Sequence, residues 1–470
     1  MPLILGTNSI KDTGYNVANS VRLFSNTYLH KTPDDAGNTT KFTTSFWVKR
    51  SKIGARQEMV AKWSSGSNNA TVRFLDDDKL AFVDYESSTT ILGKITNRKF
   101  RDVGAWYHIV CSIDTTQSVA ANRAKIFVNG VQETSFSTNT IYAEDDEISW
   151  NNTWSVNVGW SGNDGYMDGY MAEVVFIDGL QLAPTSFGEF DSDSGIWKPI
   201  DVSDLTFGTN GFYLDFEAGG NLGNDVNGGT DLTEVNLAAI DQSTDTCTNN
   251  FCTLNPLSAN EMAFSNGNLD VDQASDAGGG SRTDDNARGT IGVKSGKWYW
   301  ETKLTGATAP AVVGICFDQL AQGNDLSGST GVYAIQNASA TYAYKRENGT
   351  TAETAGFPNP VANNILSVAF DADNAKLYIG INGTYYNLAG ATGDPAGGSN
   401  ETFSSIDTSF FWLPWIESRG DNQQALMNFG SGTSYSISSG NADANGYGNF
   451  EYAVPSGYFA LNTKNLAEYG

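Results

Sequence analysis

The sequence predicts an all-β protein made of two antiparallel β-sandwiches in tandem, because one local pattern occurs in it twice. In each copy an apolar strand ends on an aspartate, Asp114 or Asp371, and the next strand ends at an Asn-Gly pair. The first copy covers residues 106–130 and the second covers residues 365–383. Asn-Gly accepts the positive φ angles of a type I′ hairpin turn, which joins neighbouring antiparallel strands.

Length and composition agree with this fold class. The chain has 470 residues, more than one hydrophobic core usually serves, so two domains of roughly 200 residues each are expected. Only 17% of the residues are charged, and 50 are glycine. A weakly charged, glycine-rich chain is typical of β-structure with many turns and not of long exposed helices.

The first domain is predicted over residues 1–216. Residues 41–50 and 106–114 alternate in side-chain character as half-buried strands do, residues 71–85 form a hairpin with three aspartates at its tip, and residues 169–179 form the last core strand. The residues expected to face the core from the first two of these strands are Phe42, Thr44, Phe46, Val48, Tyr107, Ile109, Cys111 and Ile113.

Residues 217–255 are rich in Gly, Asn, Asp and Thr and have few apolar side chains, so they are predicted to form a linker. The second domain is predicted over residues 256–470, where apolar segments recur at intervals that fit a sandwich. Its expected core stripe consists of Leu366, Val368, Phe370, Leu377, Ile379 and Ile381.

Charge disfavours two classes of partner. The chain has 28 Lys and Arg against 53 Asp and Glu, a formal net charge of −25. Such a surface repels nucleic acid and anionic lipid, so neither is expected as a partner. No apolar window is long enough to span a membrane, so membrane insertion is not expected. No secretory signal is found, so we expect synthesis in a cytoplasm.

The four cysteines are expected to be free thiols. Cys111 and Cys316 lie in apolar strand patterns, whereas Cys247 and Cys252 lie in a polar segment where a local disulfide stays open. With two histidines in the chain and no second close cysteine pair, a zinc site is not expected.

Several sequence strings resemble known families. The run FTTSFWVKR … WYHIV … KIFVNGV … DGYMAEVVFIDGLQLAP resembles the laminin-G/concanavalin A-like jelly roll. The run GKWYWETKL … VVGICFD … ILSVAFDADNAKLYIGING … LPWI … MNFG is similar to a SPRY domain, a related sandwich. The resemblance implies two tandem concanavalin A-like sandwiches, a jelly roll followed by a SPRY-like domain.

A second resemblance concerns origin. The strings FIDGLQLAPTSFGEFDSDSGIWKP, TNGFYLDF and TDTCTNNFCTLNPL resemble virion structural proteins of tailed bacteriophages. This resemblance implies a virion protein that faces host-surface glycans, such as a tail fibre, an adhesin or a capsid decoration protein, with other virion proteins as partners.

Jelly rolls of this kind generally bind sugars by stacking aromatic rings on pyranose rings, with Asp and Asn side chains bonded to the hydroxyls. A glycine-rich loop at residues 160–170 offers both kinds of group at the end of a sandwich, where binding residues concentrate. The alternative is a packed loop whose Asp and Asn side chains cap its own turns. The predicted glycan-binding residues are Trp160, Asn163, Asp164, Tyr166 and Asp168.

Two acidic segments are candidates for Ca²⁺, which prefers carboxylate and carbonyl oxygens from several converging loops. The alternative is a pair of solvated acidic turns, which also prevent edge-to-edge strand pairing. The candidate Ca²⁺ ligands are Asp76, Asp77, Asp78, Asp145 and Asp146.

Enzymatic activity is not expected. A retaining glycosidase needs two carboxylates about 5–5.5 Å apart, and the Glu-x-Asp-x-x-Glu strand motif that usually presents them is missing. The pairs Asp84/Glu86 and Asp215/Glu217 have suitable spacing but lack a third acidic residue in register. The chain also lacks a Gly-x-Ser-x-Gly elbow and a phosphate-binding loop.

Two functions therefore stay open at this point. One is a virion-displayed, lectin-like protein that binds host glycans, and the other is a purely structural virion protein whose sandwiches pack against other subunits. No heptad or triple-helix pattern specifies an oligomer, so homo-oligomerisation stays open as well.

Overall fold

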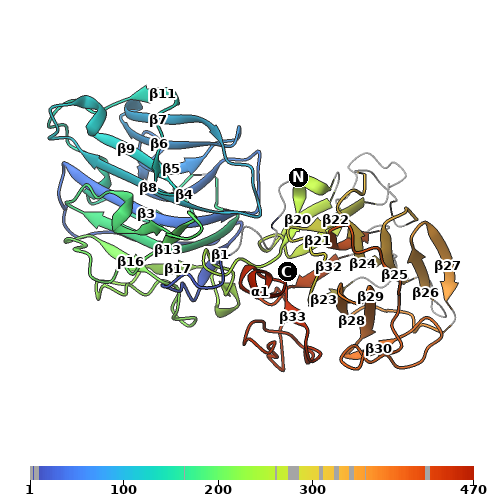
Figure 1. Ribbon diagram of the computed structural model, residues 1–470. Coiled ribbons are helices and arrows are strands. Elements are labelled where there is room, and N and C mark those ends of the chain that lie inside the picture. The colour runs from blue at the N-terminus through green and yellow to red at the C-terminus, as the bar shows by residue number, and fades with distance from the viewer. Residues whose placement is uncertain are drawn as a thin grey trace. The chain divides into compact units, whose positions relative to one another are not determined.

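The computed structural model describes residues 4, 10–163, 165–259, 262–273, 285–305, 311–321, 326, 328–337, 343–354, 356–418 and 424–470. The chain divides into two compact units (Figure 1). The N-terminal unit is Asp12–Thr248, and the C-terminal unit combines Met1–Lys11 with Asn249–Gly470. Within the described ranges the fold is nearly all-β, with one α-helix, α1 (Thr463–Tyr469).

The N-terminal unit contains two large antiparallel sheets. Sheet 1 has the order β10-β9-β8-β3-β13-β1-β18, with β16 paired to β13. Its strands are β1 (Ser20–Leu23), β3 (Lys41–Arg50), β8 (Trp106–Asp114), β9 (Ala124–Val128), β10 (Val131–Gln132), β13 (Gly169–Asp178), β16 (Phe212–Leu214) and β18 (Gln242–Ser243).

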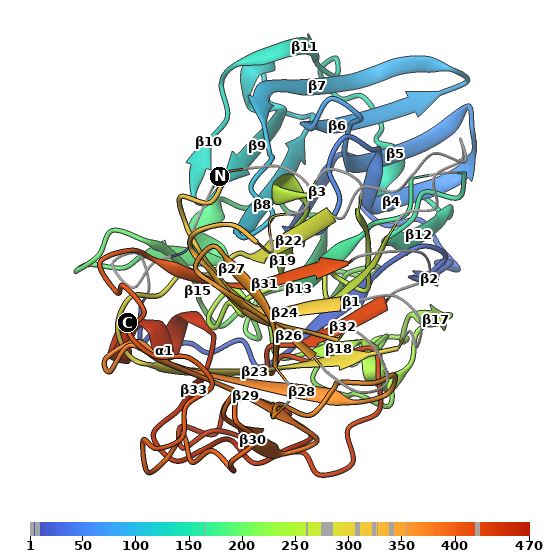
Figure 2. The same cartoon turned by 90° about the vertical axis from the view of Figure 1, so that its right-hand side faces the viewer.

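Sheet 2 has the order β11-β7-β6-β5-β4-β12-β2-β17, and Figure 2 shows the run from β7 to β2. Its strands are β2 (Tyr28–Lys31), β4 (Gln57–Ser65), β5 (Asn68–Phe74), β6 (Lys79–Glu86), β7 (Thr89–Lys99), β11 (Phe136–Thr140), β12 (Ser155–Val158) and β17 (Thr233–Val235). A separate hairpin pairs β14 (Gly188–Phe190) with β15 (Trp197–Pro199).

The C-terminal unit is also built on two sheets. Sheet 3 has the order β19-β22-β31-β24-β25-β26-β27, and its strands are β19 (Leu254–Asn255), β22 (Asp285–Gly289), β24 (Ala311–Phe317), β25 (Val332–Asn337), β26 (Ala343–Glu347), β27 (Thr350–Thr354) and β31 (Trp412–Ser418). Sheet 4 has the order β20-β21-β32-β23-β28-β29-β30, with the short strand β33 (Phe459–Ala460) parallel to β23. Its other strands are β20 (Met262–Ser265), β21 (Asp270–Gln273), β23 (Lys297–Leu304), β28 (Ile365–Asp371), β29 (Lys376–Ile381), β30 (Thr384–Tyr386) and β32 (Gln424–Asn428).

The predicted fold class is confirmed. Both Asn-Gly pairs adopt positive φ at both positions, 48° and 77° at Asn129-Gly130 and 49° and 80° at Asn382-Gly383, as a type I′ turn requires. The expected stripes lie in the two cores, with Thr44 buried beside them and Ile381 half-buried against its core. All four cysteines are free thiols, and no described helix has the length and apolarity to cross a membrane.

The division of the chain differs from the predicted boundary at 216 and the predicted linker 217–255. Residues 217–248 belong to the N-terminal unit, where β17 pairs with β2 and β18 pairs with β1. Leu222 and Leu232 are buried in its core. Polar loops in this segment are held by Asp225, which accepts backbone hydrogen bonds from Tyr213 and Asn227. A few anchors therefore suffice to order a segment whose composition is typical of a linker.

Irregular chain covers the outer face of sheet 1, and buried polar groups hold it there. Lys49 on β3 forms an ion pair with Asp245 (Nζ–Oδ2 2.7 Å), and the Trp106 indole donates to the same carboxylate at 3.0 Å. Glu173 on β13 accepts hydrogen bonds from the hydroxyls of Tyr15 (3.2 Å) and Tyr213 (2.8 Å). The outer side of sheet 1 is therefore covered at β3, β8 and β13.

In the C-terminal unit a buried carboxylate likewise holds irregular chain against a sheet. Glu301 on β23 accepts hydrogen bonds from the Tyr299 hydroxyl at 2.8 Å and from the backbone N–H groups of Glu451 and Tyr452 at 3.0 and 2.8 Å. Burial raises the pKa of this carboxyl. The contacts attach a long irregular segment to the centre of sheet 4.

The buried Glu173 predicts a pH-dependent stability. Burial raises its pKa from the ordinary 4.5 to about 8, so the folded unit binds this proton more tightly than the unfolded chain. Glu173 therefore makes its full contribution to the free energy of unfolding below about pH 4.5. That contribution falls as the pH rises towards about 8, by at most about 1.4 kcal/mol per pH unit. Thermal unfolding of the wild type and Glu173→Gln between pH 5 and 8 should show a smaller slope in the variant. Equal slopes would contradict the prediction.

Candidate functional site

The outer face of sheet 2 brings together aromatic and charged side chains from β4, β5 and β6. Ala70, Val72 and Phe74 of β5 lie in the core, so the alternate residues of that strand face outward. Strand register then sets rows of neighbours across this face, and two of them carry aromatic or charged side chains. One row is Trp63, Asn69 and Tyr85; the other is Glu58, Arg73 and Ala81.

The loop 159–168 adds an aromatic cluster to this sheet. The rings of Trp160 and Tyr166 are stacked, with centroids 5.5 Å apart and planes 5° apart, and Tyr28 of β2 lies 4.6 Å from Trp160. The ring centroid of His30 lies 5.7 Å from that of Tyr28. All four side chains are half-buried, so one side of the cluster reaches solvent. Two of the predicted glycan-binding residues, Trp160 and Tyr166, therefore lie in one aromatic cluster.

The loop is held close to the sheet. Gly162 has a φ of +91°, and a Cβ at this position would overlap the ring of Trp63, so the backbone itself packs on the tryptophan. On the return to β13, the carbonyl of Asp168 accepts hydrogen bonds from the backbone N–H of Ser51 (2.9 Å) and from Gln57 Nε2 (3.2 Å). These contacts fix the loop between the two stacked residues and again just after Tyr166.

The other three predicted glycan-binding residues have different outcomes. Asn163 is exposed and lies at the rim of a pocket beside the loop. Asp164 lies outside the described residues. Asp168 is half-buried beside the sheet, and burial raises the pKa of its carboxyl to about 6 although Lys52 opposes the shift.

The pocket has a volume of about 310 Å³ and opens over β4, β5 and β6. Glu58, the strand partner of Arg73, is fully buried and accepts hydrogen bonds from Arg56 (2.6 Å) and from the Thr71 hydroxyl (2.5 Å). The residues that line the pocket are Arg56, Trp63, Gly66, Asn69, Arg73, Tyr85, Ser88 and Asn163. Of these, the sequence predicted only Asn163, because the others meet through strand pairing.

The aspartates predicted to bind Ca²⁺ have other roles at the first segment. Asp76 is exposed, and Asp77 pairs with Lys79 at 2.7 Å. Asp78 is buried, and its carboxylate contacts Arg50 (Nη1–Oδ1 3.1 Å) and Arg101 (Nε–Oδ2 3.2 Å). Its position is that of an ion-pair partner and not of a metal ligand.

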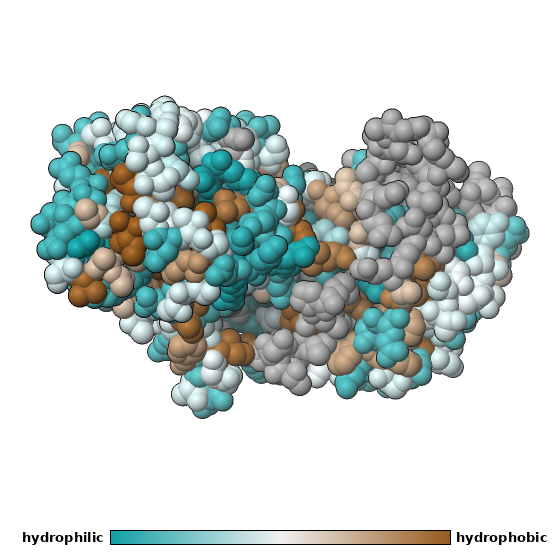
Figure 3. All heavy atoms as spheres, turned by 90° about the horizontal axis from the view of Figure 1, so that it is seen from above, coloured by the Kyte–Doolittle hydropathy of each residue, from teal (hydrophilic) through white to brown (hydrophobic). Residues whose placement is uncertain are grey.

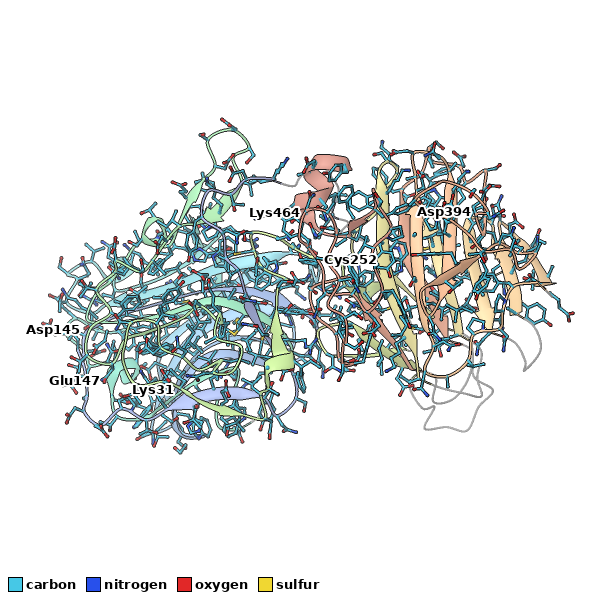
Figure 4. All side chains as sticks on the ribbon, turned by 90° about the horizontal axis from the view of Figure 1, so that it is seen from below. Lys31, Asp145, Glu147, Cys252, Asp394 and Lys464 are labelled. Carbon is cyan, nitrogen blue, oxygen red and sulfur yellow. The ribbon has the colours of Figure 1, made fainter. Side chains whose placement is uncertain are left out.

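In the second acidic segment the carboxylates are exposed or bonded to the backbone. Asp145 and Glu147 are exposed and lie at the margin of the N-terminal unit (Figure 4). Asp146 accepts a hydrogen bond from the backbone N–H of Ala143 at 2.6 Å. Across the part of the chain that is described, no three His, Cys, Asp or Glu side chains are grouped to hold a metal.

Asp84 of the first acidic pair and the contact between Ser45 and His108 have structural partners as well. Asp84 accepts hydrogen bonds from the Tyr142 hydroxyl (2.6 Å) and the Ser149 N–H (3.0 Å). His108 Nδ1 accepts from the Trp197 indole (3.0 Å), so its Nε2 carries the proton that faces the Ser45 hydroxyl at 2.8 Å. Burial lowers the pKa of His108 to about 3, which keeps the imidazole neutral. In this tautomer Nε2 cannot accept a proton from Ser45.

Comparison with protein families supports the concanavalin A-like fold predicted for the first domain. Residues 25–180 match the family model Laminin_G_3, described as the concanavalin A-like lectin/glucanases superfamily. This segment contains β2 to β13 and therefore the aromatic cluster and the pocket. No curated protein matches the chain.

Two solved structures resemble part of the chain. The SPRY domain of human HERC1 is 14% identical, with a TM-score of 0.29, and the match covers 39% of this chain and 99% of that one. The PSpry domain of TRIM65 is 15% identical, with a TM-score of 0.28, and the match covers 38% of this chain and 91% of that one.

The ion pair of Asp78 predicts how the N-terminal unit responds to mutation. Asp78→Asn should lower the unfolding free energy by about 3–5 kcal/mol, because the buried Arg50 loses its charged partner. Asp78 has a φ of +66°, which asparagine tolerates, so the backbone itself is not strained by the change. The unfolding temperature of the wild type should be the same with added Ca²⁺ as with a chelator.

The matched control is Asp76→Asn at the exposed neighbouring position, which should leave the unfolding temperature unchanged. A stabilisation of the wild type by Ca²⁺ that is lost in Asp78→Asn would instead restore the calcium interpretation.

Proposed function

We propose that the N-terminal unit binds carbohydrate on the outer face of sheet 2. The observation that carries the proposal is the stacked pair Trp160–Tyr166 beside a polar pocket. Aromatic faces next to amide and charged groups suit a sugar ring, which has apolar C–H faces and a periphery of hydroxyls. The match of this segment to a lectin and glucanase superfamily supports the same assignment.

The pre-formed geometry also favours binding. The Trp160–Tyr166 stack is extended by Tyr28, and the backbone of the loop rests on Trp63 through Gly162. Rings already fixed by packing lose little conformational freedom when a ligand arrives, which preserves affinity. A sugar bound here would contact rings from β2 and the loop at once.

The biological setting we propose is a bacteriophage particle. The protein would be a virion component, as a tail fibre, an adhesin or a capsid decoration protein, that attaches to glycans on the host surface alongside other virion proteins. The support is the resemblance of three sequence strings to phage virion proteins. We propose binding without catalysis, because Asp84 and the Ser45–His108 contact are engaged in structural hydrogen bonds.

A purely structural role is the second candidate, and one surface favours it. Phe190 and Ile196 flank the turn of the β14–β15 hairpin and are exposed, Phe190 by 53%. Trp197 next to them contacts Gly130, which adjoins the exposed Val131. The surface of the N-terminal unit seen in Figure 3 is mainly hydrophilic with separate hydrophobic patches. An apolar group on such a surface suits contact with another subunit.

Trp160→Ala tests the carbohydrate site. The variant should lose at least about fivefold in retention on glycan arrays and host cells. Stacking of a nucleic-acid base on an aromatic ring is worth about 1–3 kcal/mol, and we expect a sugar face to contribute a similar amount. Its thermal unfolding should stay close to that of the wild type, since the ring is half-buried on the outer face.

Phe190→Ala is the matched control, an exposed aromatic ring removed from another surface of the same unit. It should keep glycan retention. Loss of particle incorporation in Phe190→Ala, with no glycan retained by the wild-type protein, would favour the structural role instead.

A further inference from the structure

Arg73 on β5 is buried but poorly paired. The residue is only 8% exposed, and its Nε has no hydrogen-bond partner. Its Nη2 makes one long hydrogen bond to the Tyr85 hydroxyl (3.4 Å), and its Nη1 lies 3.7 Å from Glu58 Oε1, beyond hydrogen-bond distance. A guanidinium carries five N–H donors, and leaving them unpaired in a buried position costs stability.

The carboxylate nearest to Arg73 is already engaged. Arg56 contacts Glu58 Oε1 through both Nε and Nη2 at 2.6 Å, and the Thr71 hydroxyl occupies Oε2. Two guanidinium groups therefore share one carboxylate, and one positive charge is left over. Among the described residues that line the pocket there is no aspartate or glutamate to balance it.

This local charge is opposite to that of the chain as a whole. With a formal net charge of −25, the protein repels anions at long range. A buried, unbalanced arginine at the floor of a pocket is therefore a local exception. The Tyr85 hydroxyl reaches Arg73, and Asn69 and Trp63 line the same pocket.

We infer that this pocket binds the carboxylate of an acidic sugar, with Arg73 as its partner; the inference rests on the proposed carbohydrate function. The planar fork of a guanidinium matches a carboxylate with two parallel hydrogen bonds, which a neutral hydroxyl does not reproduce. The pocket volume of about 310 Å³ is at the lower end for small-molecule sites and suits one end of a glycan chain.

The test compares oligogalacturonate with its methyl ester, which has the same sugar rings without the negative charge. The full-length wild type should retain the acid at least about tenfold better than the ester, as expected for hydrogen bonds to charged groups. Added salt should not abolish this preference, because it screens the repulsion by the acidic surface more than a buried pair.

Arg73→Met should remove the preference and bring retention of the acid to that of the ester. It should also leave the unfolding temperature unchanged or higher, because a poorly paired buried charge is replaced by an apolar side chain. Arg98→Met is the matched control, an exposed arginine on β7 that pairs with Glu133 at 2.9 Å, and it should keep the preference.

Other outcomes separate this inference from the proposed function. Equal retention of acid and ester, unaffected by Arg73→Met, would overturn the acidic-sugar site and leave carbohydrate binding intact. No retention of either ligand would overturn the acidic-sugar inference alone. No retention of any chain on a broad glycan array would overturn the proposed carbohydrate function as well. If Arg73→Met does not fold, the same comparison of acid and ester retention is made with Arg73→Gln, which should also lose the preference for the acid. Failure of both variants to fold would overturn the inference, because the fold itself would then require the guanidinium.

Discussion

The alternation of side chains along β5 is the constraint on which the N-terminal unit depends. Ala70, Val72 and Phe74 fill the core, so the residues between them must face outward, and pairing with β4 and β6 decides what each one meets. A shift of register by one residue would turn Arg73 into the core and a phenylalanine into solvent. Formation of the core and assembly of the candidate site are therefore one event.

The fold class follows from local signals, because hairpin turns and apolar stripes act over a few residues. Trp160 and Tyr166 could be predicted together as candidate site residues because one short loop carries both. Tyr28, Trp63 and Arg73 were missed. They join the site through strand pairing between distant segments, and a polar or aromatic residue on the outer face of a strand has no local feature that marks it as functional.

The same limit explains the two predictions that differ from the structure. An acidic hairpin tip is typical of a solvated turn or a cation site, yet Asp78 neutralises a buried arginine 28 residues away. Residues 217–248 have the composition of a linker, yet they complete both sheets of the unit through β17 and β18. The composition of a segment indicates only how well its side chains are solvated on average. The burial of Asp78 and of residues 217–248 depends instead on a few specific partners that are distant in the sequence.

The path of the backbone gives the N-terminal unit one more property. Its first and last segments adjoin, because Val17 N–H donates to the Thr248 hydroxyl at 3.1 Å and Ser20 pairs with Ser243. The chain on both sides of it, 1–11 and 249–470, belongs to the other unit. In topology the N-terminal unit is thus an insertion within the chain of the C-terminal unit. Recombination at its two neighbouring ends would exchange the whole unit, with the outer face of sheet 2, in a single genetic event while leaving every strand of the C-terminal unit in place.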